Sequence, residues 1–183
     1  MADTLQRNVV LIGYRGVGKT SIGKRLAEML GVPFVDIDEI IASEAGMSIA
    51  EIFAAEGEAG FRKHEKEVIA RVAATVPAVV SVGGGAVLDE ENVSRLKAGG
   101  VVVWLTAPAE VLWSRISSDE SSAAARPALT AHSGLEEVRT VLSSREALYR
   151  GAADVVVSTA GRTPQDVTIE LVRRLDESVD RGV

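Results

Sequence analysis

Apolar and polar residues are arranged in two different patterns along this chain. Short apolar runs rich in β-branched residues recur and predict buried strands. The five runs are residues 9–12, 33–36, 78–82, 101–105 and 154–158. The longer segments between them repeat apolar residues every three or four positions, which predicts amphipathic helices. These segments are residues 20–30, 48–53, 57–75, 89–98, 108–117, 134–149 and 164–179.

Strands that alternate with helices predict a parallel sheet with right-handed crossovers. No internal repeat or break in composition divides the chain, so we expect one domain over residues 1–183. Residues 38–75 form a double helical insertion between the second and third strands. Residues 117–133 lack periodicity, and we interpret them as a lid, because phosphoryl transfer to anything but water requires that water be excluded.

Composition narrows the class of protein. Of the 183 residues, 46% are apolar but only 4% aromatic, so aliphatic side chains must fill the core, as is typical of parallel sheets covered by helices. The net charge of −6, without a basic stripe, argues against a nucleic-acid partner. The absence of cysteine excludes a disulfide framework. No signal-like or membrane-length apolar segment is visible, so we expect a cytoplasmic protein.

The most specific motif is Gly13-Tyr14-Arg15-Gly16-Val17-Gly18-Lys19-Thr20, which lies between the first predicted strand and a predicted helix. This is the phosphate-loop motif G-x-x-x-x-G-K-[ST], and it stands between a strand and a helix, as the motif requires. A glycine-rich turn that binds nothing would not need this combination of features. The motif predicts a nucleoside triphosphate site formed by Gly16, Val17, Gly18, Lys19, Thr20 and Ser21. Lys19 would supply charge to the β- and γ-phosphates, and Thr20 a hydroxyl to Mg²⁺.

Two carboxylates, Asp36 and Asp38, follow the second predicted strand. Ligands of open parallel sheets bind beyond such strand ends, and residues two apart in extended chain point to the same side. One carboxylate can then help to hold hydrated Mg²⁺ near Thr20. The other can accept a hydrogen bond from an acceptor hydroxyl and orient it for in-line attack. The spacing alone supports equally well the alternative that Asp38 only caps a helix beginning near Glu39.

Three arginines, Arg62, Arg126 and Arg145, are candidates for anion binding. Guanidinium groups bind carboxylates and phosphates through two parallel hydrogen bonds. Arg126 lies in the predicted lid, where it could meet charge that builds on the transferred phosphoryl group. Taken singly, each has the simpler interpretation of a solvated surface charge, and Arg62 would then pair with Glu58 or Glu65 on its own helix.

Gly83-Gly84-Gly85 follows the third predicted strand, where three glycines indicate close approach by a ligand better than a generic turn. Many phosphate-loop proteins carry an aspartate at the end of such a strand, and this chain has none there. Asp36 is therefore the best candidate to assist a metal ion.

Taken together, these motifs resemble the shikimate kinase family over residues 9 to about 166. The phosphate loop is shared by many kinases, but the other matching motifs, in this order, are specific. They are Asp36-Ile37-Asp38, Ile52-Phe53 through Glu56-Gly57-Glu58, Phe61-Arg62 with Glu65, Gly83-Gly84-Gly85, Arg126-Pro127 and Arg145 with Leu148-Tyr149. The resemblance implies a three-layer α/β phosphate-loop kinase fold. Its five parallel strands would have the order 2-3-1-4-5 and be flanked by helices, with insertion 38–75 binding substrate.

The resemblance also implies an activity: phosphorylation of the 3-hydroxyl of shikimate, on the route through chorismate to aromatic amino acids. ATP would be the co-substrate and Mg²⁺ the metal. Asp38 would contact the ring hydroxyls and act as the base or orienting group. Arg62 and Arg145 would hold the substrate carboxylate, and Gly84 would offer a backbone contact.

The resemblance assigns the remaining residues to the two ends of the site. Arg126 would move with the lid onto the phosphates and act in catalysis beside Lys19 and Asp38. Phe53 and Phe61 would line the substrate cavity, and Arg162 would lie near the turn that contacts adenine. Within the loop, Tyr14-Arg15 departs from the usual small apolar pair, and Arg15 would add positive charge beside the phosphates.

Other functions make different demands on the sequence. A nucleoside monophosphate kinase would need more arginines in its lid than the single arginine of the lid predicted here. A GTP switch would need an Asn-Lys-x-Asp motif, which is absent from the sequence. A sugar-acid kinase such as gluconate kinase is a closer alternative, because its substrate also carries a carboxylate. A non-catalytic ATP-binding module would bind nucleotide without turnover. Small size and the lack of an evident apolar patch favour a monomer.

Overall fold

Five parallel strands form the centre of the molecule in a computed structural model that describes residues 7–75, 77–118 and 134–179. The strand order β2-β3-β1-β4-β5 confirms the order expected from the resemblance. In the middle of the sheet, Val9 pairs with Val79 on one side and Val101 on the other. The strands are β1 (Asn8–Ile12), β2 (Phe34–Asp36), β3 (Val79–Ser81), β4 (Gly100–Thr106) and β5 (Val155–Ser158).

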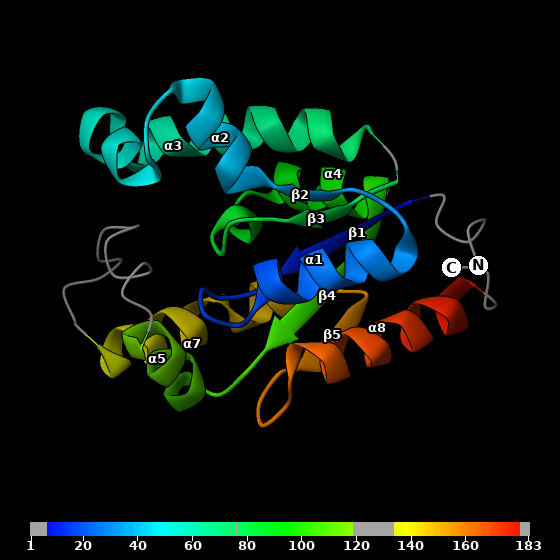
Figure 1. The fold of residues 1–183 in the computed structure, drawn as a ribbon. Helices are drawn as coiled ribbons and strands as arrows, with labels where there is room; N and C mark the ends of the chain where they lie inside the picture. Colours follow the sequence, from blue (N-terminus) through cyan, green and yellow to red (C-terminus); the bar gives the residue numbers. More distant parts are fainter. Residues whose placement is uncertain (1–6, 76, 119–133, 180–183) are drawn as a thin grey trace.

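Helices cover both faces of this sheet (Figure 1). The helices on the face of α1 are α1 (Lys19–Leu30), α5 (Ala109–Ser118) and α8 (Pro164–Val179). The opposite face carries α2 (Ile37–Ala45), α3 (Ile49–Ala73), α4 (Glu90–Gly99) and the short 3₁₀ turn η1 (Ala86–Leu88). Helix α7 (Leu135–Ala152) contributes its first half to one core and its last turn to the other.

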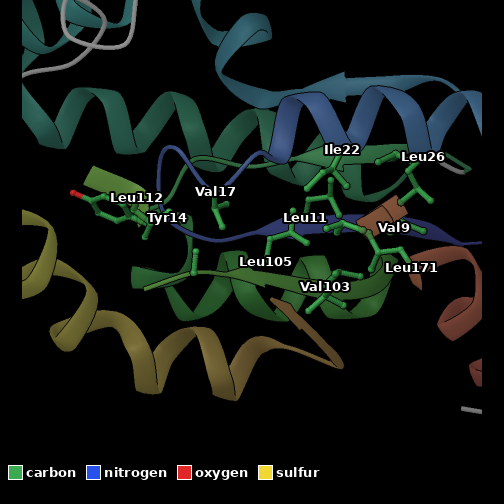
Figure 2. Packing of buried hydrophobic residues seen from close by; sticks show 14 of the residues in the cluster. Val9, Leu11, Tyr14, Val17, Ile22, Leu26, Val103, Leu105, Leu112 and Leu171 are labelled. Carbon is green, nitrogen blue, oxygen red and sulfur yellow. The ribbon is translucent and has the colours of Figure 1, made fainter. Parts of the chain in front are cut away.

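Strand β1 shows why the strands read as continuous apolar runs. Val9 and Leu11 pack with Ile22 and Leu26 of α1 in one core (Figure 2), while Val10 belongs to the core on the other face. Successive side chains of a strand point to opposite faces. Because both faces are covered by helices, every position of β1 is buried and four of its five residues are apolar. The exception is Asn8 at its start, whose side chain donates to the Thr75 carbonyl and accepts from the Ala78 N–H.

The insertion after β2 differs from its prediction at two points. Helix α2, considered from the sequence only as a helix beginning near Glu39, begins at Ile37, directly after β2. The Asp36 carboxylate accepts a hydrogen bond from the Asp38 backbone N–H at 3.0 Å. Asp36 is therefore the helix cap, and the alternative that Asp38 caps a helix beginning near Glu39 is wrong, because Asp38 is already within the first turn.

The two helices predicted over residues 48–53 and 57–75 are parts of one kinked helix, α3. Ser48 and Glu51 form the expected capping box, in which the Glu51 carboxylate accepts from the Ser48 N–H at 2.7 Å. The helix then kinks at Gly57, whose φ of 71° is favourable only for glycine. Within the described residues, no helix has both the length and the apolar character that a membrane span requires.

The predicted lid lies almost entirely outside the described residues. Only Ser117 and Ser118 of that segment are described, at the end of α5. Arg126 lies beyond them, so its predicted role stays a prediction.

Candidate active site

A cavity of about 660 Å³ opens at the carboxyl ends of the strands, where the sheet topology places ligands. The phosphate loop and the start of α1 form one wall. Asp36, Asp38, Ser81, Gly83 and Gly84 come from the ends of β2 and β3. The far wall is formed by Arg115, Thr159, Arg162, Pro164 and Val167.

The phosphate loop is built to receive an anion. Gly18 precedes α1 with a φ of 100°, and no side chain caps this end of the helix. The first backbone N–H groups of α1 are therefore available to a phosphate, and the positive end of the helix dipole faces it. The Lys19 ammonium donates to the carbonyl oxygens of Gly13 at 2.8 Å and Tyr14 at 3.3 Å, which keeps its charge at the loop.

Thr20 and Asp36 meet at the edge of this loop, as the sequence predicted. The Thr20 hydroxyl donates to Asp36 Oδ2 at 3.5 Å, while Asp36 Oδ1 caps α2. The described residues contain no group of three or more side chains that could hold a metal by themselves. One hydroxyl and one carboxylate still fit Mg²⁺, because this ion takes one or two protein oxygens and completes its shell with phosphate and water.

Arg62, Arg145 and Gly84, predicted to bind the acid substrate, come together from three elements. Arg145 of α7 donates to the Gly84 carbonyl at 3.1 Å, and the buried Tyr149 hydroxyl donates to the same oxygen. Burial raises the pKa of Tyr149, so this hydroxyl keeps the proton that it donates. Neither arginine lines the 660 Å³ cavity itself, but both reach the edge formed by Gly84 and its neighbour Gly85.

Glu65 is a buried carboxylate that contacts Arg62 and is also influenced by the charge of Arg145. Arg62 Nη1 donates to Glu65 Oε2 at 2.7 Å, and the Glu65 side chain is 0% exposed. Burial raises the pKa of Glu65 above its ordinary value, although the charges of Arg62 and Arg145 oppose the shift. Burial alone would lower the pKa of Arg62, but the carboxylates of Glu65 and Glu58 raise it. Arg62 is therefore not a solvated surface charge.

The three glycines after β3 serve two different neighbours. Gly83 and Gly84 line the cavity, in keeping with the predicted approach of a ligand. At Gly85 the close neighbour is Arg62, since a Cβ there would lie 2.2 Å from Arg62 Nη2. For Gly85 the prediction of a ligand was therefore wrong, and the protein's own guanidinium takes the space.

The remaining predicted residues lie at the two ends of the site. Phe53 and Phe61 stack with ring centroids 4.7 Å apart, and Arg62 lies over the Phe61 ring, but neither phenylalanine lines the cavity. Arg162 does line it, and donates to the backbone carbonyls of Ser158 and Asp166 and to the Glu170 carboxylate.

Arg115, Thr159 and Pro164 were not predicted. The Arg115 guanidinium donates to the Thr159 hydroxyl at 3.0 Å, to the Thr159 carbonyl at 2.8 Å and to the Gly16 carbonyl at 3.4 Å. It thus joins α5, the segment after β5 and the phosphate loop. The position of Thr159, directly after the last strand, was the one signal available, because strand ends of this kind face ligands.

Comparisons with known proteins agree with this geometry. A family model described as shikimate kinase matches residues 15–176. A shikimate kinase of Symbiobacterium thermophilum is 44% identical over 175 residues, covering 96% of this chain and 99% of that protein. One from Rhodopirellula baltica is 40% identical over 96% of this chain and 94% of its own. A solved structure of the Acinetobacter baumannii shikimate kinase in complex with shikimate superposes with a TM-score of 0.87 at 33% identity, covering 94% of each chain. The chain therefore belongs to the shikimate kinase family.

Proposed function

We propose that this protein transfers the γ-phosphoryl group of ATP to the 3-hydroxyl of shikimate, which gives shikimate 3-phosphate and ADP. One observation carries the proposal beyond family membership. The phosphate loop, Asp38 and Gly84 line a single cavity, and the edge of that cavity at Gly84 and Gly85 holds two guanidinium groups. A triphosphate and a small hydroxylated acid can therefore bind side by side.

The nucleotide would bind between the phosphate loop and the wall formed by Arg115, Arg162 and Pro164. Its phosphates bind the amides of Gly16, Val17 and Gly18 and the side chains of Lys19 and Ser21. The base then extends toward the far wall, where the guanidinium plane of Arg115 and the ring of Pro164 offer flat surfaces. Arg162, which lines the same wall, contributes to this end of the nucleotide site.

The acid substrate would bind between α2, α3 and α7. Arg62 and Arg145 hold its carboxylate, and Asp38 accepts a hydrogen bond from the reacting hydroxyl and orients it toward the terminal phosphorus. The Gly84 carbonyl already accepts from Arg145 and Tyr149. The backbone contact that Gly84 gives to substrate is therefore its N–H.

Besides positioning, catalysis of phosphoryl transfer depends mainly on neutralising the charge of the phosphate oxygens. Lys19 meets the charge that develops between the β- and γ-phosphates, and Arg126 is proposed to approach the same oxygens. Thr20 and Asp36 would hold Mg²⁺, which supplies Lewis-acid neutralisation of the phosphate oxygens when it is bound.

The test is an assay of ADP release with shikimate, quinate, gluconate and nucleoside monophosphates as alternative acceptors, with the Lys19→Ala variant as the inactive control. We expect turnover with shikimate far above that with the others. Preference for gluconate or a nucleotide would refute the substrate, and nucleotide binding without turnover on any acceptor would identify a binding module.

A further inference from the structure

Two carboxylates of very different exposure hold the two terminal nitrogens of Arg62. Glu65 accepts from Nη1 at 2.7 Å and is completely buried. Glu58 accepts from Nη2 at 3.1 Å, and its side chain is 63% exposed. Glu58 follows the kink at Gly57, which begins the helical segment that carries it one turn before Arg62. One partner of Arg62 is thus shielded from water, and the other is open to it.

We propose that Glu58 is an internal competitor of the acid substrate: it binds the Nη2 edge of Arg62 in the empty enzyme and yields that edge to the substrate carboxylate. The proposal rests on the proposed function, which assigns Arg62 to this carboxylate. A guanidinium group binds a carboxylate through its edge. With Nη1 committed to Glu65, the edge that an incoming carboxylate can take includes the nitrogen that Glu58 occupies.

Arg62 cannot simply turn away to bind both groups. A Cβ at Gly85 would lie 2.2 Å from Nη2 and 2.8 Å from Nη1, so the backbone after β3 closely backs the guanidinium. The buried bond to Glu65 fixes it from the other side. Glu58 is the exposed member of this group, and its pairing with Arg62 can be given up at low cost because an exposed ion pair contributes little.

This competition gives the site selectivity among anions. The substrate carboxylate can reach both Arg62 and Arg145, and so displaces Glu58. A simple anion that contacts Arg62 alone has to exchange one exposed ion pair for another and gains little. Removing the Glu58 charge should therefore tighten the binding of shikimate and also admit inorganic phosphate.

The experiment compares Glu58→Gln with Glu56→Gln, measuring KM for shikimate, KM for ATP and inhibition by inorganic phosphate at low ionic strength. Glu56 is a matched control, because it is exposed, lies on the same helix and pairs with His64 rather than Arg62. For Glu58→Gln we expect KM for shikimate to fall by about two- to five-fold, the range of an exposed ion pair, without a parallel change for ATP. Inorganic phosphate should compete with shikimate at lower concentration.

An unchanged or higher KM for shikimate in Glu58→Gln would overturn the proposal, and so would an equal fall in Glu56→Gln, which would indicate a general charge effect. Phosphate inhibition equal to that of the wild type would also overturn it. If the wild-type protein does not phosphorylate shikimate at all, the proposed function fails, and this inference fails with it. If the wild-type protein phosphorylates shikimate but the constants of Glu58→Gln equal those of the wild type, the inference fails and the proposed function stands.

Discussion

Replacing Gly85 by alanine tests whether Arg62 must lie where the structure places it. The backbone of Gly85, with φ −102° and ψ 0°, is one that alanine also adopts. The conflict is therefore confined to the side chain, since the new Cβ would lie 2.2 Å from Arg62 Nη2 and 2.8 Å from Arg62 Cζ. An ordinary contact begins near 3.4 Å. The guanidinium must then withdraw by about 1.2 Å, the difference between these two distances.

This displacement should affect function more than folding. The atom that moves is the end of a flexible side chain, so the fold can absorb the methyl group by weakening the Arg62–Glu65 bond, at a cost of about 1–2 kcal/mol. A misplacement of about 1 Å in a positioning group costs up to about 100-fold in substrate use. We expect KM for shikimate to rise by about 10- to 100-fold, or about 1.4–2.7 kcal/mol, and KM for ATP to stay within about two-fold.

The ADP-release assay, with each substrate varied in turn, measures both constants. Gly151→Ala is the matched control, because Gly151 lies in the last turn of α7 and a Cβ there meets no atom within 4 Å. It should leave both constants unchanged and the protein equally or slightly more stable. An acid KM within about two-fold of wild type in Gly85→Ala, or an equal rise for ATP, would show that the position of Arg62 does not govern acid binding.

Three further predictions follow from the site and its supporting helices. Asp38→Asn should lower kcat by about 100-fold or more while ATP affinity measured by calorimetry stays unchanged; a loss of thermal stability alone would contradict its role toward the hydroxyl. Ser48→Ala should remove the capping box of α3 and lower the free energy of unfolding by about 1 kcal/mol in urea titrations, and no loss would mean that the cap contributes nothing. The raised pKa of Glu65 means that the folded protein binds this proton more tightly than the unfolded chain, so stability falls as pH rises from about 4.5 through the raised value. Glu65→Gln should remove that downward slope from unfolding free energies measured across this pH range, and an unchanged slope would assign it to another group.

The five strands could be predicted from sequence because their physical cause is local. The three inner strands, β1, β3 and β4, are largely buried on both faces, and the sequence records this as apolar runs, while the edge strands β2 and β5 are only partly buried. Strand order is not local, since β1 pairs with β3 and β4, which are distant in the chain. The order was predicted from the family resemblance, not from the pattern of residues. Helix α2 was considered only as an alternative beginning near Glu39, and its start was misplaced because α2 follows β2 without a loop, so that Asp36 both ends the strand and caps the helix.

Site residues that follow the ends of strands could be predicted from the sequence, because their position in the chain indicates where they lie. Residues whose chemistry depends on burial could not be judged in this way. Glu65 stands three residues after Arg62, a spacing typical of a solvated helix pair worth a few tenths of a kcal/mol. Its complete burial depends on the packing of α3 against the rest of the molecule, which spacing cannot express. Arg115 was missed for the same reason, because its partners Thr159 and Gly16 are distant in sequence.

Arg15 shows how a tertiary contact changes the meaning of a motif. From the loop sequence alone, its charge was expected to add to that of Lys19 beside the phosphates. In the structure, Arg15 Nη2 lies 3.2 Å from Glu137 Oε1, on the first turn of α7, and the Glu137 side chain is only 5% exposed. A carboxylate buried to that extent requires a nearby cation, and breaking such a pair is strongly unfavourable. The charge of Arg15 is therefore compensated by Glu137 across 122 positions of sequence. The field that a nucleotide meets at the loop then depends mainly on Lys19 and the backbone amides, as in a loop that carries an uncharged residue in place of Arg15.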